Sequence, residues 1–136
     1  MYNLKHSDIT GSIIKSFYKV YNSLGYGFLE KVYENALLIE LRELGLKVEQ
    51  QIGIHVFYRN QLVGEYFTDL VVEDVVIVEL KTAVSISNAH EAQLINYLRA
   101  TKFDVGLILN FGQTTEYKRK IFDIETTYSL SVLFDP

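Results

Sequence analysis

The sequence predicts one α/β domain of the α+β kind, in which a mixed sheet is flanked by helices. Residues 8–44 carry apolar side chains at helical spacing, and from residue 46 the pattern changes to short apolar strands divided by turns. A further helix and more strands follow, so the predicted order is α-α-β-β-β-α-β-β, which is typical of a mixed sheet with helices packed on it. The length of 136 residues and the lack of a linker indicate a single domain, residues 1–136.

Two helices are predicted first, at residues 8–24 and at about 28–44. Gly27 is the expected N-cap of the second helix, which would place Glu30 at its third position, and Gly45 is suited to end it. The residues expected to face the core in the two helices are Ile9, Ile13, Phe17, Val20 or Tyr21, Leu24, Leu29, Val32 or Tyr33, Ala36, Leu37, and Leu41 or Leu44.

The remaining elements follow from alternation, turn residues and one cap. Asn88, with Glu91 three residues later, indicates a variant capping box at the start of a third helix, at about 88–100. The predicted strands are residues 52–58 and 62–72, which form a hairpin, then 75–81, 105–111 and 116–122, with a further edge strand at 128–134.

Composition limits the classes of function. The absence of cysteine excludes disulfides, thiolate zinc sites and cysteine nucleophiles, and it fits a cytoplasmic protein. No signal-peptide pattern and no apolar run long enough to cross a membrane is present, so no membrane partner is expected. The formal net charge of −4 disfavours a protein that coats nucleic acid by charge alone, but it disfavours a metal-dependent site less.

The most apolar predicted strand ends in charges. Val75 to Val78 run directly into Glu79, Leu80 and Lys81. Alternate residues of a strand share a face, so Glu79 and Lys81 lie together while Leu80 points to the core. One interpretation is a strand that emerges into solvent with an ordinary surface pair. The other is a functional site, since a buried ion needs a partner or a metal.

Asp69 favours the functional interpretation. It closes the preceding strand, and counting outward from the Glu73-Asp74 turn puts Asp69 and Glu79 at about the same level of the hairpin. Two carboxylates at one level repel each other unless a cation lies between them. Mg²⁺ or Mn²⁺ suits such oxygen ligands, and Lys81 beside them could orient water or phosphate oxygens.

The helices offer further candidates, each with a structural alternative. Gln93 and Tyr97 are four residues apart and share a helix face with His90, which fits a site but also an ordinary amphipathic helix. Glu30 either closes a cap at the start of its helix or adds a carboxylate to the metal site, and these two roles are compatible.

With these residues assembled, the sequence resembles the PD-(D/E)XK nuclease superfamily. Asp69 and Glu79-Leu80-Lys81 match its central motif, and the element order matches its restriction-endonuclease-like αβββαβ core with an extra N-terminal helix. Gln93 and Tyr97 resemble the Gln-x-x-x-Tyr motif of RecB-type exonucleases. Residues 27–37 resemble the motif of the bacterial GxxExxY proteins, with Gly27, Glu30 and Tyr33 in place, and this likeness spans about residues 8–112.

The resemblance implies a nuclease that hydrolyses phosphodiester bonds with a metal-activated water, with DNA favoured over RNA. Asp69, Glu79 and Glu30 would be metal ligands for Mg²⁺ or Mn²⁺, and Lys81 the catalytic lysine. The residues implied to line the substrate site are Gln93, Tyr97, Tyr33 and His90.

Two other functions stay open. One is a non-catalytic module that keeps the nuclease-like fold to bind nucleic acid or an accessory protein. The other is a metal hydrolase for a small phosphorylated molecule. Residues 117–120, with Arg99 and Lys102, are the candidate basic patch, and strand edges near the C-terminus are compatible with a homodimer.

Overall fold

The computed structural model describes residues 5–122, and the element order over this range is the predicted one. Five strands form one sheet in the order β1-β2-β3-β4-β5, in which only β3 and β4 are parallel. The elements are α1 (Ser7–Leu24), α2 (Glu30–Glu43), β1 (Val48–Tyr58), β2 (Gln61–Val72), β3 (Val76–Lys81), α3 (Asn88–Arg99), β4 (Val105–Phe111) and β5 (Thr115–Ile121). The edge strand predicted at 128–134 lies outside the described residues.

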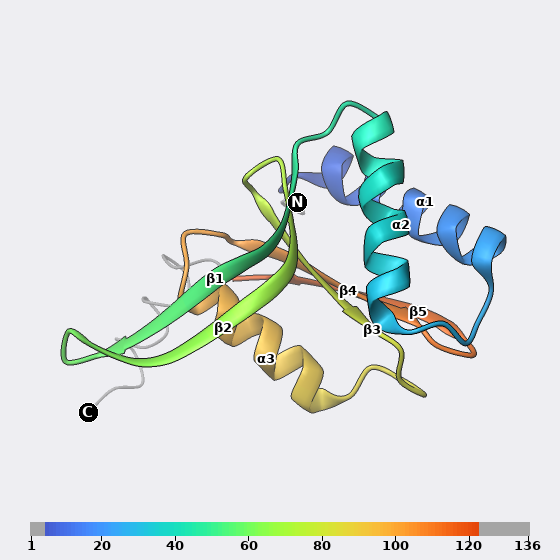
Figure 1. Ribbon diagram of the computed structural model, residues 1–136. Helices are drawn as coiled ribbons and strands as arrows, with labels where there is room; N and C mark the ends of the chain where they lie inside the picture. Colours follow the sequence, from blue (N-terminus) through green and yellow to red (C-terminus); the bar gives the residue numbers. More distant parts are fainter. Residues whose placement is uncertain (1–4, 123–136) are drawn as a thin grey trace, which may run out of the picture.

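Helices cover both faces of the sheet. Helices α1 and α2 lie on one face, and α3 lies on the other (Figure 1). The larger core includes Phe17 of α1, Leu37 of α2 and the even-numbered residues 76, 78 and 80 of β3. The smaller core joins Leu94 and Leu98 of α3 to Ile77 and Ile108. Strand β3 is therefore packed on both sides, as its continuous apolar sequence predicts.

Helix α2 begins two residues later than expected, and its N-cap is Leu29 rather than Gly27. The reason is local. The backbone N–H of Phe28 donates to the hydroxyl of Tyr33 over 3.1 Å, and Gly27 takes the left-handed φ of 114°, so the chain is not yet helical there. Glu30 is consequently the first residue of the helix instead of the third. Leu29, a predicted core residue, is 81% exposed, and Leu24 is also exposed.

The cap of α3 also differs from the predicted one. Ser87, not Asn88, is the N-cap: its hydroxyl accepts from the backbone N–H of His90 over 3.1 Å, and His90 Nδ1 accepts from the backbone N–H of Ser87 over 3.1 Å. The box is thus Ser87 with His90 in place of Asn88 with Glu91. Both hydrogen bonds satisfy N–H groups that a helix start leaves without partners.

Strands β1 and β2 form a long hairpin that extends beyond the rest of the sheet (Figure 1). They pair along almost their whole length, whereas β2 pairs with β3 only from Leu70 to Val72. Both connecting turns have two central residues with positive φ, Arg59-Asn60 at the hairpin tip and Glu73-Asp74 between β2 and β3. The hairpin turn has only these two residues, because Tyr58 pairs with Gln61, whereas the turn between β2 and β3 also includes Val75, because Val72 pairs with Val76. Short turns of this kind fix the register of the strands they join.

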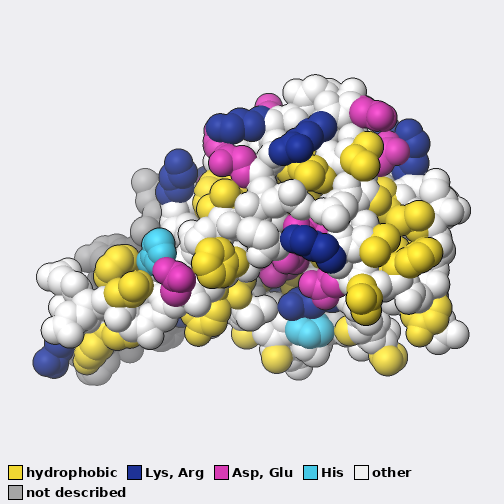
Figure 2. Space-filling model, in the orientation of Figure 1, with side chains coloured by type: hydrophobic (Ala, Val, Ile, Leu, Met, Phe, Trp, Pro, Cys, Tyr) yellow, Lys and Arg dark blue, Asp and Glu magenta, His cyan; other side chains and the backbone are white. Residues whose placement is uncertain are grey.

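Apolar side chains are exposed in two regions of the surface. One is the outer part of the hairpin, at the left of Figure 2, and the other surrounds the loop between α1 and α2, at the right. Acidic and basic side chains meet over the middle of this face (Figure 2). Among the helices of residues 5–122, none is long and apolar enough to cross a membrane.

Candidate active site

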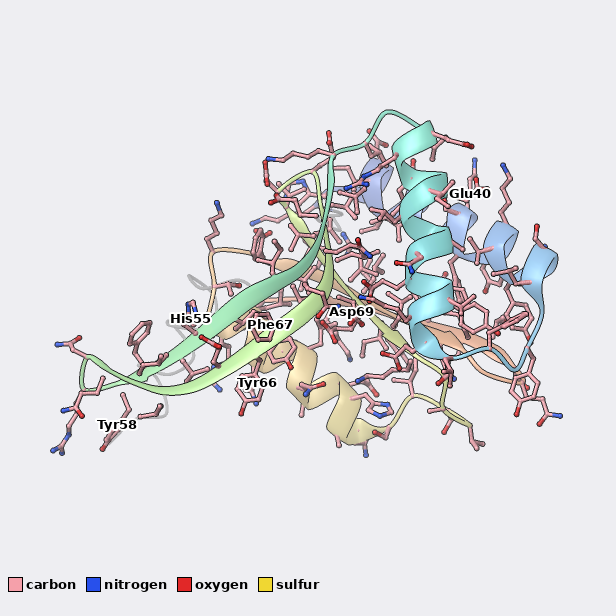
Figure 3. All side chains as sticks on the ribbon, viewed as in Figure 1. Glu40, His55, Tyr58, Tyr66, Phe67 and Asp69 are labelled. Atoms are coloured by element: carbon pink, nitrogen blue, oxygen red, sulfur yellow. The ribbon has the colours of Figure 1, made fainter. Side chains whose placement is uncertain are left out.

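Asp69 and Glu79 meet where β2 and β3 separate. The register that pairs Leu70 with Val78 places Asp69 opposite Glu79, as counting from the turn predicts. Here side chains replace the backbone ladder: the N–H of Asp69 donates to Glu79 Oε1 over 3.2 Å, and the N–H of Leu80 donates to Asp69 Oδ2 over 2.7 Å. Figure 3 shows Asp69 on β2, in the region between α2 and α3. Each carboxylate is fixed by the other strand and keeps one oxygen free of backbone amides.

The end of β3 has the predicted alternation and a firm support. Leu80 is fully buried in the larger core, while Glu79 and Lys81 belong to the opposite face of the strand. Beyond Lys81, the side chain of Asn110 both donates to the carbonyl oxygen of Ala83 over 3.0 Å and accepts from its N–H over 2.9 Å. This buried amide holds the chain that leaves β3 against β4, and so limits where Lys81 can lie.

Burial makes Glu79 an unusually weak acid. Its side chain is buried, with 6% of the residue exposed, and desolvation together with the charge of Asp69 raises its pKa from 4.5 to about 7. Hydrogen bonds from Thr68 and the Asp69 amide and the charge of Lys81 lower it, but by less. A group with this pKa exchanges protons near neutral pH and has a strong electrostatic preference for a nearby cation.

Two neighbouring carboxylates are perturbed in the same direction. Desolvation, then the charge of Asp69, raises the pKa of Glu30. Desolvation also raises the pKa of Asp69, and Glu34 adds to this. Lys81 lowers the pKa of both Glu30 and Asp69, so the structure brings all four of the predicted charged residues into one electrostatic cluster.

Glu34 and Gln51 belong to this cluster and were not predicted. Glu34 is 3% exposed, and its carboxylate accepts from Gln50 (2.8 Å), Lys31 (2.9 Å) and Gln51 (3.1 Å). The Gln51 amide also approaches Asp69 Oδ1 at 3.5 Å. The sequence contained one signal for Glu34, because it lies four residues after Glu30 and therefore on the same helix face. Gln51 had no such signal.

Gln51 has a backbone conformation that is unusual within a strand. Its φ is 54°, in the left-handed region, although its neighbours Gln50 and Ile52 pair regularly with β2. A residue other than glycine pays about 1–2 kcal/mol for this conformation. Strain of this kind is concentrated at functional sites, where other interactions hold it in place. Here it accompanies the contact of the Gln51 amide with Glu34 and Asp69.

We expect Gln51→Gly to be more stable than Gln51→Ala by about 1 kcal/mol, which reverses the usual order within a strand. Both substitutions remove the amide, but only glycine adopts a φ of 54° without strain. Urea unfolding of the two variants measures the difference. A more stable alanine variant would show that residue 51 does not keep its left-handed backbone.

Gln93 and Tyr97 line a cavity of about 720 Å³ between the hairpin and α3. The ring of Tyr97 lies 5.6 Å from that of Tyr66 in β2, and Figure 3 shows Tyr66 on the side of the hairpin next to α3. Desolvation, then the charge of Glu79, raises the pKa of Tyr97 to about 12. Tyr97 therefore stays protonated and stands between the carboxylate cluster and the cavity.

The structure does not bring Tyr33 to the surface of this site, whereas His90 is partly exposed in the first turn of α3. Tyr33 is fully buried, and its hydroxyl donates to the carbonyl oxygen of Gly25 over 2.6 Å while its ring stacks on Phe111. It shapes the loop before Glu30 and cannot line a substrate site, which corrects that expectation. The Nδ1 atom of His90 is used in the cap of α3.

The donor chemistry fits a divalent cation, although no complete cage is formed. Within residues 5–122, no three His, Asp or Glu side chains are placed to hold a metal ion. Mg²⁺, however, is usually held by one or two carboxylates, with waters and substrate phosphates completing its shell. Asp69 Oδ1 and Glu79 Oε2 are oxygens of this type, in a cluster where negative charge exceeds positive charge.

Comparison with known families agrees with this geometry. The model of the PD-(D/E)XK nuclease superfamily matches residues 7–121, from the start of α1 to the end of β5. The chain belongs to the PD-(D/E)XK nuclease superfamily. The fold observed here, with three helices on a five-stranded mixed sheet, is the restriction-endonuclease-like fold that the sequence predicted for a member of this superfamily. Among curated proteins, no sequence matches the chain.

Solved structures resemble this member of the PD-(D/E)XK superfamily at low identity. The crystal structure of SSO0001 aligns with a TM-score of 0.52 and 16% identity over 93% of the chain, and the chain spans 64% of the length of SSO0001. An alkaline exonuclease (LHK-Exo) from Laribacter hongkongensis aligns with a TM-score of 0.49 and 10% identity, over 96% of this chain and 77% of that one. At this identity, the likeness to SSO0001 shows the fold alone.

Proposed function

We propose that the chain is a nuclease that hydrolyses phosphodiester bonds of DNA, in preference to RNA, with the help of Mg²⁺ or Mn²⁺. The observation that carries the proposal is the pair of crossed hydrogen bonds between β2 and β3. They fix Asp69 and Glu79 side by side where the two strands separate, with Lys81 two residues after Glu79 at the end of β3. Asp69, Glu79 and Lys81 are the residues by which the sequence resembles the central motif of the PD-(D/E)XK superfamily, whose model matches residues 7–121.

Each residue has a distinct role in the proposed reaction. Asp69 and Glu79 would hold the metal through the oxygens that the backbone amides leave free, and Glu30 would approach it from the first turn of α2. When bound, the metal supplies an activated water and stabilises charge on the phosphate. Lys81 donates to the phosphate oxygens, where negative charge increases in the transition state.

We further propose that the chain is related to the GxxExxY proteins within the superfamily. Each motif residue has a physical role that supports this assignment. Gly27 adopts the φ of 114° in the loop before α2. The hydroxyl of Tyr33 holds this loop through hydrogen bonds to the backbone of Gly25 and Phe28. Glu30 then begins α2 close to the other carboxylates. The motif therefore specifies how one acidic side chain reaches the site.

The test combines cleavage with metal binding. Wild-type protein should cut DNA with Mg²⁺ or Mn²⁺ and stop cutting when the metal is chelated. Calorimetric titration with Mn²⁺ should show weaker binding by Glu79→Ala than by the wild type. In metal sites generally, replacing a residue that only supports a ligand lowers metal affinity by about 10- to 100-fold. Removal of Glu79, which is proposed to be a ligand itself, should lower Mn²⁺ affinity by at least as much. Cleavage that survives in Glu79→Ala would refute the assignment.

A second candidate is a module with this fold that binds nucleic acid or a protein without cutting. It is favoured by the net charge of −4 and by the lack of three converging ligands within residues 5–122. Equal Mn²⁺ binding by wild type and Glu79→Ala, with no cleavage by either, would select this candidate.

A further inference from the structure

The cavity between the hairpin and α3 lies beside the carboxylate cluster. Tyr97 borders both: it lines the cavity, contacts the Tyr66 ring, and is close enough to Glu79 and Asp69 for their charges to act on its hydroxyl. The volume of about 720 Å³ is in the range that takes a drug-sized ligand, so roughly one nucleotide fits. A strand of nucleic acid lying on the cluster would therefore pass the mouth of this cavity.

The hairpin side of the cavity offers aromatic surface. Tyr66 and Phe57 line it from β2 and β1, and they are 46% and 62% exposed. Exposed rings of this kind on a two-stranded ribbon are unfavourable in water unless something covers them. Bases of single-stranded nucleic acid stack on aromatic side chains with about 1–3 kcal/mol per base, whatever their sequence.

The α3 side offers space and hydrogen-bonding groups. Three alanines, Ala89, Ala92 and Ala100, leave room along the helix, and Gln93 and Asn96 add amides. Within residues 5–122, the side chains of Gln93, Asn96 and Arg99 have no hydrogen bond or ion pair. Amides of this kind pair with base edges, and a guanidinium pairs with phosphate.

The charge of the lining also fits nucleic acid. Arg99 is a cation, and among residues 5–122 no Asp or Glu lines the cavity, although the chain as a whole carries a net charge of −4. His55, the other basic residue of the lining, is within 3.0 Å of Glu65. The described lining of the cavity is thus less acidic than the chain as a whole.

Resting on the proposed nuclease function, we propose that this cavity receives an unstacked base, so that the substrate is single-stranded at the point of cleavage. Tyr66 stacks on the base, Gln93 or Asn96 contacts its edge, and Arg99 contacts the adjacent phosphate. A duplex is a poor ligand here, because its bases cover one another's faces and their pairing edges are occupied.

The experiment measures binding without cleavage. Fluorescence anisotropy in EDTA follows binding of a fluorescein-labelled oligo-dT strand and of its duplex with oligo-dA. We expect the wild type to bind the single strand more tightly than the duplex. Tyr66→Ala should weaken single-strand binding by about 5- to 150-fold, as expected for the loss of one stacked base, and Tyr66→Phe should retain it.

The matched control is Tyr58→Ala, which removes the same ring from the same hairpin near its tip, where Tyr58 is 64% exposed and does not line the cavity. Thermal melts establish that the variants are folded. Equal losses in Tyr66→Ala and Tyr58→Ala, or duplex binding as tight as single-strand binding, would overturn the proposal. Since the assay contains no metal, its result is independent of whether the wild type cuts DNA in the cleavage test.

Discussion

Replacing Lys81 with methionine is expected to lower kcat for DNA cleavage by about 100- to 1,000-fold, the usual effect of removing one donor to transition-state charge. Methionine keeps an unbranched apolar stem but loses the ammonium. Lys81 lies next to the cluster, since its charge lowers the pKa of Glu30, Asp69 and Glu79. Within the described chain, no other basic residue lowers the pKa of all three carboxylates.

The same variant separates catalysis from metal binding. Lys81 is not a ligand, so Lys81→Met should bind Mn²⁺ at least as well as the wild type, whereas Glu79→Ala should not. Single-turnover cleavage and calorimetry on the same samples measure both properties. Lys19→Met is a suitable control, because Lys19 is exposed on α1 and pairs with Glu40 at 3.1 Å. A full cleavage rate in Lys81→Met would exclude the proposed role of the lysine.

The meeting of Asp69 and Glu79 could be predicted from the sequence because it depends on a short-range feature. Glu73 and Asp74 both adopt positive φ in a three-residue turn with Val75, and this tight turn, centred on Asp74, sets the register of β2 against β3. Once the register is fixed, the positions of residues five steps away on either strand follow from counting. Leu80 could be assigned to the core in the same way, from alternation alone.

The supports of the site could not be predicted, because they depend on contacts between distant elements. Gln51 reaches Glu34 from β1 to α2 through a left-handed backbone that no pattern in the residues around it indicates. The start of α2 was misplaced for a related reason. The hydroxyl of Tyr33 binds the backbone of the loop before the helix, and this contact overrides the ordinary preference for glycine or another capping residue next to the first turn.

Metal-free wild-type protein is expected to lose up to about 3 kcal/mol of stability through Glu79 as the pH rises from about 4.5 to 7. The pKa of Glu79 is 4.5 when unfolded and about 7 when folded. Between these values the folded state binds more protons than the unfolded state, so raising the pH favours unfolding. Below 4.5 the group is protonated in both states, and its effect is absent.

Glu79→Gln should remove this dependence. Glutamine has nearly the same shape and can still accept from the backbone N–H of Asp69, but it carries no charge at any pH. Urea unfolding in EDTA at several pH values should show the variant gaining stability relative to the wild type above about pH 5, with the full gain reached above pH 7. The lowered pKa values of Asp74 and Glu91 make the folded state more stable as the pH rises, which is the opposite effect. Both residues are present in the two proteins, so their contributions cancel in the comparison.

Adding Mg²⁺ at pH 8 should then reverse the order of the two proteins. A cation that binds the folded wild type stabilises it in proportion to its affinity, and Glu79→Gln lacks the charge that binds it. The Glu79 carboxylate would thus destabilise the metal-free fold and also create the metal site. Functional sites commonly show this trade-off between stability and activity. A stability difference that does not change with pH would mean that the pKa of Glu79 is not raised. A difference that does not change with Mg²⁺ would mean that Glu79 does not bind the metal.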